Sequence, residues 1–178
     1  MKLLHRLAIL GMVLSLVWIP ARALSQSQIV PRREVLYLNS YHRGYKFADD
    51  VTRGLEAVLD SAGEDIDLWV EYMDLKRIDD PAYLEELAQL YRVKYGTRQP
   101  DLIISSDDAA LDFLFQYANE LFPDVPVVFC GANYFDVTRL AGHKNFTGVS
   151  EIADVAGTVD LALQLHPQTR QIFVVNDM

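Results

Sequence analysis

Short apolar runs alternate with segments of helical periodicity along almost the whole chain. Six runs of strand length are predicted, at 35–38, 66–72, 102–104, 127–129, 146–149 and 172–175. Between them, apolar residues recur with the 3.6-residue period of a helix that buries one face. The strands are apolar on both faces, which is typical of a parallel sheet covered by helices on both sides and wound right-handed. The sequence therefore predicts an α/β fold, a doubly wound parallel sheet flanked by helices.

Capping signals indicate where three of the helices begin. Asp49 or Asp50 can cap the first helix, and Asp80 followed by Pro81 begins the second. The polar segment 105–108 can cap the third. Strand ends and helix starts thus follow one another closely, as the alternating pattern requires.

The first 23 residues have the features of a secretory signal peptide. Lys2 and Arg6 precede an apolar run over 7–19, and Ala21 and Ala23 form a small-x-small cleavage site. The run is shorter than the ~20 residues of a spanning helix, which favours cleavage, and an uncleaved anchor is the alternative. We therefore expect a periplasmic or otherwise extracytoplasmic protein whose mature chain begins with a polar leader over 24–33.

Charge and cysteine content exclude several classes of function. Cleavage after Ala23 lowers the number of basic residues from 16 to 13 against 25 acids, a net charge of −12. A protein that binds nucleic acid through phosphates needs a basic face, so we expect no nucleic-acid partner. Cys130 is the only cysteine and follows the apolar run 125–129, so it predicts a buried, inert thiol.

Signatures of catalysis and of cofactors are missing from the places where they should stand. No glycine-rich loop follows the first strand, which argues against dinucleotides and against the phosphate loop of nucleotide hydrolases. No nucleophile elbow is present either. We expect no enzyme activity and no cofactor.

Ligand-binding candidates lie after the strands, because open parallel sheets bind ligands beyond the carboxyl ends of their strands. The candidates are Ser40, Tyr41, His42, Tyr45, Phe47, Asp74, Ser106, Asp107, Asn133 and Glu151. The segment 40–47 is the densest, because its aromatic rings can grip a ligand with little loss of side-chain entropy. Two alternatives stay open. Tyr45 and Phe47 could simply cover the apolar top of the sheet. His42 could be a surface or hydrogen-bonding histidine and not a proton donor, because the sequence identifies no carboxylate partner for it.

Acidic residues at the third helix start have two interpretations. A helix N-terminus favours anions, but Asp107 and Asp108 can satisfy its N–H groups themselves, so capping alone is the simpler role. A metal site is not expected, since the pair has no third ligand at a recognisable spacing. Lys76 and Arg77 can bind an anion or pair with neighbouring acids.

Longer stretches resemble a known family of extracytoplasmic domains. The stretches are 38–42 with 44–45 and 49–50, 71–74 with 76–77, 100–104 with 106–111, and 122–131 with Asn133. In this order they resemble the sensor domain of the ABC-transporter substrate-binding-protein-like family, which precedes membrane-bound histidine kinases and diguanylate cyclases. The resemblance runs from about Val35 to Asp177, and Phe47 stands where the family suggests a tryptophan.

The resemblance implies a type I periplasmic-binding fold in which two α/β lobes close on a small molecule. It implies that 34–170 form the N-terminal lobe and that 171–178 hold the first strand of a truncated second lobe. The membrane connection would then be a segment after Met178 or the uncleaved anchor, and the full receptor could be a homodimer. We expect the sensing domain of a signalling receptor. The alternatives are the carrier component of an uptake system and, less favoured, a secreted enzyme on the same scaffold.

Overall fold

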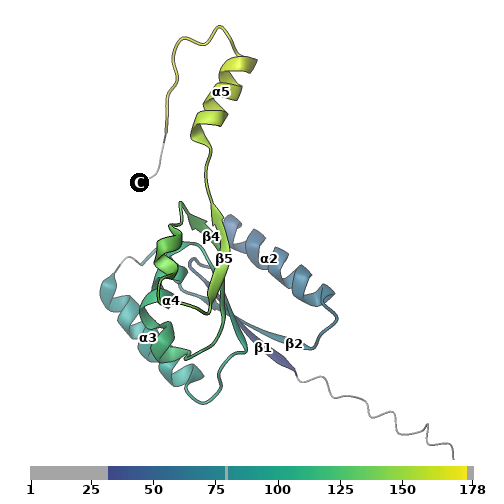
Figure 1. Cartoon of the computed structure of the whole chain (residues 1–178), viewed down its shortest axis with the longest axis vertical. Helices are drawn as coiled ribbons and strands as arrows, with labels where there is room; N and C mark the ends of the chain where they lie inside the picture. The colour runs from purple at the N-terminus through teal and green to yellow at the C-terminus, as the bar shows by residue number, and fades with distance from the viewer. Residues whose placement is uncertain (1–31, 79, 176–178) are drawn as a thin grey trace, which may run out of the picture. The chain divides into compact units, whose positions relative to one another are not determined.

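The strands of the sheet run in one direction and in the order β2-β1-β3-β4-β5 (Figure 1). In the computed structural model, which describes residues 32–78 and 80–175, the strands are β1 (Arg33–Asn39), β2 (Ile66–Tyr72), β3 (Leu102–Ser106), β4 (Val127–Asn133) and β5 (Phe146–Glu151). This order confirms the doubly wound parallel sheet. The predicted signal peptide (1–23) and all but the last two residues of the leader (24–33) lie outside the described residues.

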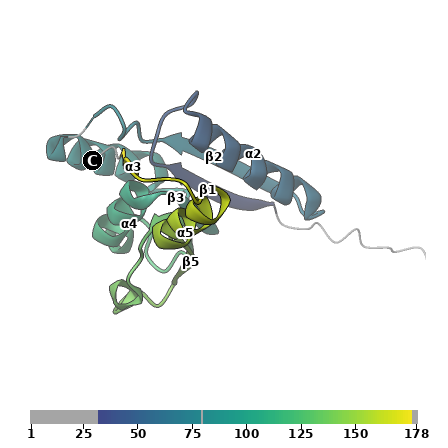
Figure 2. The same cartoon turned by 90° about the horizontal axis from the view of Figure 1, so that it is seen from above.

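Helices cover the two faces of the sheet unequally. Helix α2 (Lys46–Ser61) lies over the face to which β1 turns Asn39, which donates a hydrogen bond to Thr52 of that helix at 3.4 Å. Helices α3 (Pro81–Tyr95) and α4 (Asp108–Leu121) lie on the opposite face (Figure 2). A short 3₁₀ helix, Val137–Leu140, joins β4 to β5.

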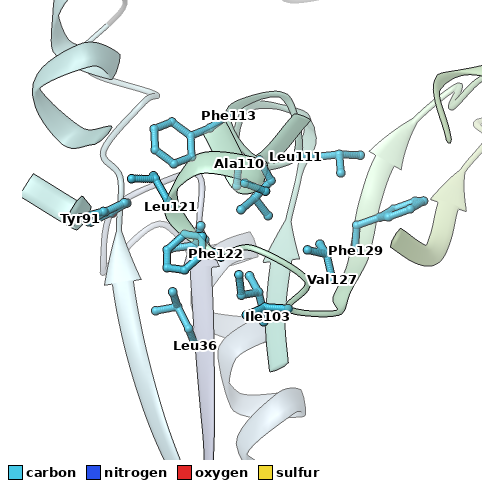
Figure 3. Packing of buried hydrophobic residues seen from close by; sticks show 14 of the residues in the cluster. Leu36, Tyr91, Ile103, Ala110, Leu111, Phe113, Leu121, Phe122, Val127 and Phe129 are labelled. Carbon is cyan, nitrogen blue, oxygen red and sulfur yellow. The ribbon is translucent and has the colours of Figure 1, made fainter. Parts of the chain in front are cut away.

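The hydrophobic core fills the space between the sheet and helices α3 and α4. Figure 3 shows Phe113, Leu121 and Phe122 pointing toward the sheet, where they meet strand residues such as Leu36 and Ile103. Tyr91 joins them from α3, with its ring centroid 5.7 Å from that of Phe113. Side chains alternate across a strand, so the neighbours of Leu36 and Ile103 point to the α2 face.

Two of the three predicted helix starts are confirmed, and the first is corrected. Asp80 caps α3 by accepting from the backbone N–H of Ala82, and Asp107 caps α4. Helix α2 begins at Lys46, ahead of Asp49 and Asp50. The reason is that Asp49 accepts a hydrogen bond from the backbone of Gly44 at 3.0 Å, which holds the preceding loop and leaves the helix free to begin earlier.

The segment after β5 differs from the rest of the chain. Helix α5 (Val155–Leu165) forms as its periodicity predicts, capped by Asp154, yet it contains no buried residue. The strand predicted over 172–175 is not formed, and its apolar side chains are between 47% (Ile172) and 96% (Val175) exposed. A strand needs a neighbour to satisfy its backbone, and no strand among the described residues pairs with this segment. The proposed lobe boundary at 170–171 is untested by this finding and stays a prediction.

Within residues 32–78 and 80–175, no helix has both the length and the apolar character needed to cross a membrane.

Candidate functional site

The connections after β1 and β3 leave the sheet on opposite sides. The chain leaves β1 into α2 on one face, whereas it leaves β3 into α4 on the other. In the strand order 2-1-3-4-5, this divergence is the topological switch point, beyond the carboxyl ends of β1 and β3, where such folds bind ligands. The residues that come first after these strands, Ser40 and Tyr41 after β1 and Asp107 after β3, are therefore the centre of the candidate site.

Tyr41 and Asp107 connect the two diverging segments at this switch point. The Tyr41 hydroxyl donates to Oδ2 of Asp107 at 2.7 Å. Partial burial, followed by the hydrogen bond to Asp107 and the charge of its carboxylate, raises the pKa of Tyr41 well above its usual range. The hydroxyl therefore stays protonated at neutral pH and acts as a fixed donor to Asp107.

The backbone of Asp107 is held in a conformation that side chains rarely adopt. Its φ is 71° and its ψ is 168°, a region populated almost only by glycine and costing about 1–3 kcal/mol for other residues. Its N–H donates to the Cys130 carbonyl at 2.9 Å, and Oδ1 accepts from the backbone of Asp108 at 2.8 Å. Strain of this kind persists where surrounding contacts impose it, and it concentrates at functional sites.

Gly131 lies at the end of β4, next to the Asp107 turn. Its φ is 69°, a backbone conformation that favours glycine. A Cβ there would lie at ordinary van der Waals distance from the Asp107 nitrogen (3.4 Å) and from Cζ of Phe47 (3.5 Å). The backbone conformation, and not lack of space, therefore favours glycine at this position.

Ser40 and Ser106 lie beneath the site and not on its surface. Both are buried, and Oγ of Ser40 donates to the Ser106 carbonyl at 2.7 Å while accepting from the backbone of Ala110 at 2.8 Å. The Ser106 hydroxyl is 2.7 Å from the hydroxyl of Tyr37. These two predicted ligand contacts are thus engaged internally, and the structure shows them positioning β1, β3 and the first turn of α4.

Aromatic rings gather around Tyr41. Its ring centroid lies 4.8 Å from that of Tyr45 and 6.3 Å from that of Phe47, both with the rings nearly edge to face. His42 extends this group, with its ring 5.9 Å from Tyr45 and its Nδ1 3.0 Å from the carbonyl oxygen of Arg43. The Lys76 ammonium stands 5.7 Å from the centre of the Tyr41 ring, a cation–π contact that the sequence did not predict.

A second carboxylate organises the far side of the site. Asp108 accepts from the backbone and the side-chain amide of Asn133, at 3.1 and 2.8 Å. Asn133 is exposed, and Glu151, its register partner on β5, is exposed as well. The sequence predicted a capping role for Asp108. Its contact with Asn133 was not predicted, because the two residues are 25 positions apart in the sequence.

Asp74 stands at the end of β2, on the other side of Tyr41. Its backbone N–H donates to the Tyr41 carbonyl at 3.2 Å, and its own φ is 57°. Oδ2 lies 3.6 Å from Arg77, whereas Oδ1 is buried and has no hydrogen-bond partner among the described residues. The pairing of Arg77 with Asp74 agrees with the solvated pairing expected for this mixed run.

The remaining hydrogen-bonding capacity of the site consists mainly of acceptors. Most of the first backbone donors of α4 are already used: Asp108 bonds to Asp107, Ala110 to Ser40, and Leu111 to the Asp107 carbonyl at 3.4 Å. An anion would find most of these donors engaged and two carboxylates beside them. Carboxylates, by contrast, accept several hydrogen bonds each, so Asp107 and Asp108 can still receive a donor from a ligand.

No family model, curated protein or solved structure matches the chain. The observed strand order and the parallel pairing establish the α/β fold class.

Cys130 lies at the margin of the site without taking part in it. It is half-buried, and its thiol donates to the Ser105 carbonyl at 3.6 Å. Burial raises the pKa of the thiol, with smaller contributions from Glu151 and Asp107. A thiol that stays protonated is a poor nucleophile, which agrees with the inert role predicted for it.

Proposed function

We propose that the chain binds a small organic molecule at the carboxyl ends of β1 and β3 and is the sensing part of an extracytoplasmic receptor domain. The observation that carries this proposal is the Tyr41–Asp107 hydrogen bond across the point where the connections diverge. It joins a fixed donor, a strained carboxylate and an aromatic surface at the place where doubly wound folds bind ligands.

The chemistry of the site indicates what the ligand should offer. The rings of Tyr41, Tyr45 and Phe47 provide an apolar surface, and Asp107 and Asp108 provide acceptors. A ligand that combines a flat or apolar part with hydrogen-bond donors fits both. Ligands whose only polar groups are anionic fit poorly, because the carboxylates of Asp107 and Asp108 stand at the helix start and would repel them.

Exposed apolar side chains after β5 support the proposal that this domain is one of two lobes that together enclose the ligand. Helix α5 leaves Leu161 and Leu165 more than half exposed, and Phe173 to Val175 are more exposed still. Apolar surface of this extent needs a cover in water. In the proposal a second lobe provides that cover and forms the opposite wall, and the resemblance to two-lobed sensor domains together with the predicted export signal supports this arrangement.

Calorimetric titration tests the proposal with defined compounds. We would titrate the purified chain with single L-amino acids, nucleosides and monosaccharides and measure Kd. Loss of the Tyr41 hydroxyl in Tyr41→Phe should raise the Kd of a binding compound by roughly tenfold, about 1.4 kcal/mol, because the Asp107 carboxylate and the Tyr41 ring would no longer be held in place by each other. Asn133→Ala should also weaken binding.

Tyr117→Phe is the matched control, because Tyr117 stands on α4 against Phe113 and away from the site. It makes the same chemical change and should leave Kd unaltered. Binding that is indifferent to both Tyr41→Phe and Asn133→Ala would show that the site lies elsewhere. Failure of every compound class to bind would count against the proposal for this chain.

A further inference from the structure

Strand β2 ends the sheet on one side, and its outer backbone groups pair with no strand of the described residues. The Asp65 carbonyl accepts from Arg33 and the Met73 N–H donates to Asn39, so both residues point toward β1. The N–H and C=O groups of successive residues point to opposite sides of a strand, and the β1–β2 register is continuous. The N–H and C=O groups of Ile66, Leu68, Val70 and Tyr72 therefore point outward, where no described strand pairs with them.

This edge lacks several of the features that usually block pairing with another chain. Strand β2 contains no proline, lysine or bulge, all seven of its residues are half-buried, and its only charged residues are Asp67 and Glu71. The opposite edge differs: the β4–β5 ladder shifts register after Phe129, and β5 is exposed from Thr147 onward. Irregular pairing is itself a protective feature, so of the two edges β2 is the one open to association.

Open grooves flank β2 on both faces of the sheet. On the α2 side the groove has an apolar floor of Ile66, Leu68 and Val70 and an acidic rim of Glu56, Asp60 and Glu64. On the α3 side another groove is lined by Trp69, Lys94, Tyr95 and Arg98. A strand added at this edge would therefore find apolar strand residues and the Trp69 and Tyr95 rings to pack against.

We propose that β2 pairs antiparallel with β2 of a second copy of the chain, about a twofold axis at Trp69. This register is the one in which all four outward residues exchange hydrogen bonds, Ile66 with the partner's Tyr72 and Leu68 with the partner's Val70. Both pairs are apolar, and the sequence of outward residues is self-complementary, as an isologous dimer requires. The self-complementarity favours a second copy over an unrelated strand.

The central position brings the two Trp69 side chains together. Trp69 falls in a non-hydrogen-bonded pair, where facing side chains are closest. Its ring stacks on Tyr95 at 5.7 Å, and the Arg98 guanidinium lies 4.6 Å from the ring centre. Tryptophan, tyrosine and arginine are the residues most often found at the energetic centre of protein interfaces.

Two acidic residues, Asp67 and Glu71, lie at the β2–β2 seam, the row of residues where the two strands would meet, and each is paired with a base of its own copy. The register sets Asp67 beside the partner's Glu71, which alone would repel. However, Asp67 is paired with Arg32 at 2.9 Å and with Arg98 at 3.6 Å, and Glu71 is paired with Lys94. Asp67 and Glu71 thus each bring a base of their own copy, which reduces the repulsion between the two strands.

Sedimentation equilibrium of the purified chain tests the proposal. We expect a concentration-dependent dimer, and Val70→Lys should raise its dissociation constant at least tenfold by adding an edge lysine. Val93→Lys is the matched control, since Val93 is 82% exposed on α3 and outside the seam; it should leave the dimer unchanged. A chain that stays monomeric at all concentrations, or a dimer that Val70→Lys leaves intact, overturns the proposal.

Cysteine crosslinking tests the register and does not depend on the lysine variant folding. In a Cys130→Ser background, Trp69→Cys should form an intermolecular disulfide on mild oxidation, because Cα atoms about 4.5 Å apart in such a pair lie within disulfide range. Val93→Cys in the same background should not. Equal crosslinking of the two variants overturns the twofold at Trp69. A dimer lost on Leu165→Asp but not on Val70→Lys would assign association to α5 and overturn the proposal as well.

Discussion

The Tyr41 hydroxyl donates a 2.7 Å hydrogen bond to the Asp107 carboxylate, across 66 residues of sequence. This contact joins the loop after β1 to the helix start after β3, where the connections turn to opposite faces of the sheet. It also orients the ring against which Tyr45 and Phe47 pack, so the aromatic surface and the carboxylate are fixed together.

Removing this hydroxyl should cost the fold no more than one charge-assisted hydrogen bond. Tyr41 is only partly buried, so Tyr41→Phe should lower the free energy of unfolding by about 1.5 kcal/mol, the low end of the range for a hydrogen bond to a charged group. Urea denaturation at pH 7 measures this, with Tyr117→Phe as the control. A loss of several kcal/mol would mean that the pair serves mainly to hold the fold.

The strained backbone of Asp107 predicts an unusual order among variants. Both Asp107→Ala and Asp107→Gly remove the cap and the partner of Tyr41, but only glycine tolerates a φ of 71°. The glycine variant should therefore unfold at a higher urea concentration, by an amount equivalent to about 1 kcal/mol. An alanine variant as stable as the glycine variant would argue against strain at this position.

Ser40 should prove structurally costly to replace. Ser40→Ala leaves the buried N–H of Ala110 without its acceptor, and an unsatisfied buried group costs about 1–3 kcal/mol. Ser61→Ala is the control, because the Ser61 hydroxyl bonds to the Val58 carbonyl at the exposed end of α2. Thermal denaturation should separate the two variants, and equal stabilities would contradict the positioning role.

Gly148 on β5 should tolerate no side chain. A Cβ there would lie 2.2 Å from the Phe129 carbonyl oxygen, so Gly148→Ala must push β5 away from β4. We expect a loss of roughly 2 kcal/mol or more, in the range typical of overpacked sites. Gly54→Ala, which meets open space on helix α2, should instead stabilise the chain by about 0.5–1 kcal/mol. Similar effects of both substitutions would contradict the observed β4–β5 packing.

Alkaline pH should destabilise the fold through its buried tyrosines. Burial raises the pKa of Tyr91 and of Tyr95, with the nearby Glu71 carboxylate adding to the effect. The folded state therefore favours the neutral phenols. Their contribution is complete below the unfolded pKa near 10 and is lost progressively as the pH rises above that value. The free energy of unfolding should be flat from pH 8 to 9 and fall beyond pH 10, and Tyr91→Phe should reduce that slope. An unchanged slope would contradict the role of Tyr91.

The sequence by itself determined the alternation of strands and helices, because apolar periodicity and capping residues act over a few neighbouring positions. It located every strand of the sheet and the caps Asp80 and Asp107, and it placed the candidate residues at the carboxyl ends of the strands. Its failures were also local. The start of α2 depends on a loop contact of Asp49, and the apolar run at 172–175 forms no strand because pairing requires a neighbour that local sequence cannot supply.

Only the tertiary structure decided which of those residues form a site. Strand order brings Tyr41 to Asp107, buries Ser40 and Ser106 beneath them, and sets Lys76 over the Tyr41 ring. It also leaves β2 at one edge of the sheet with a continuous register to β1, whereas the β4–β5 ladder at the other edge shifts register. These relationships join positions tens of residues apart, so they follow from the register of one strand against another, which no single segment of the sequence encodes.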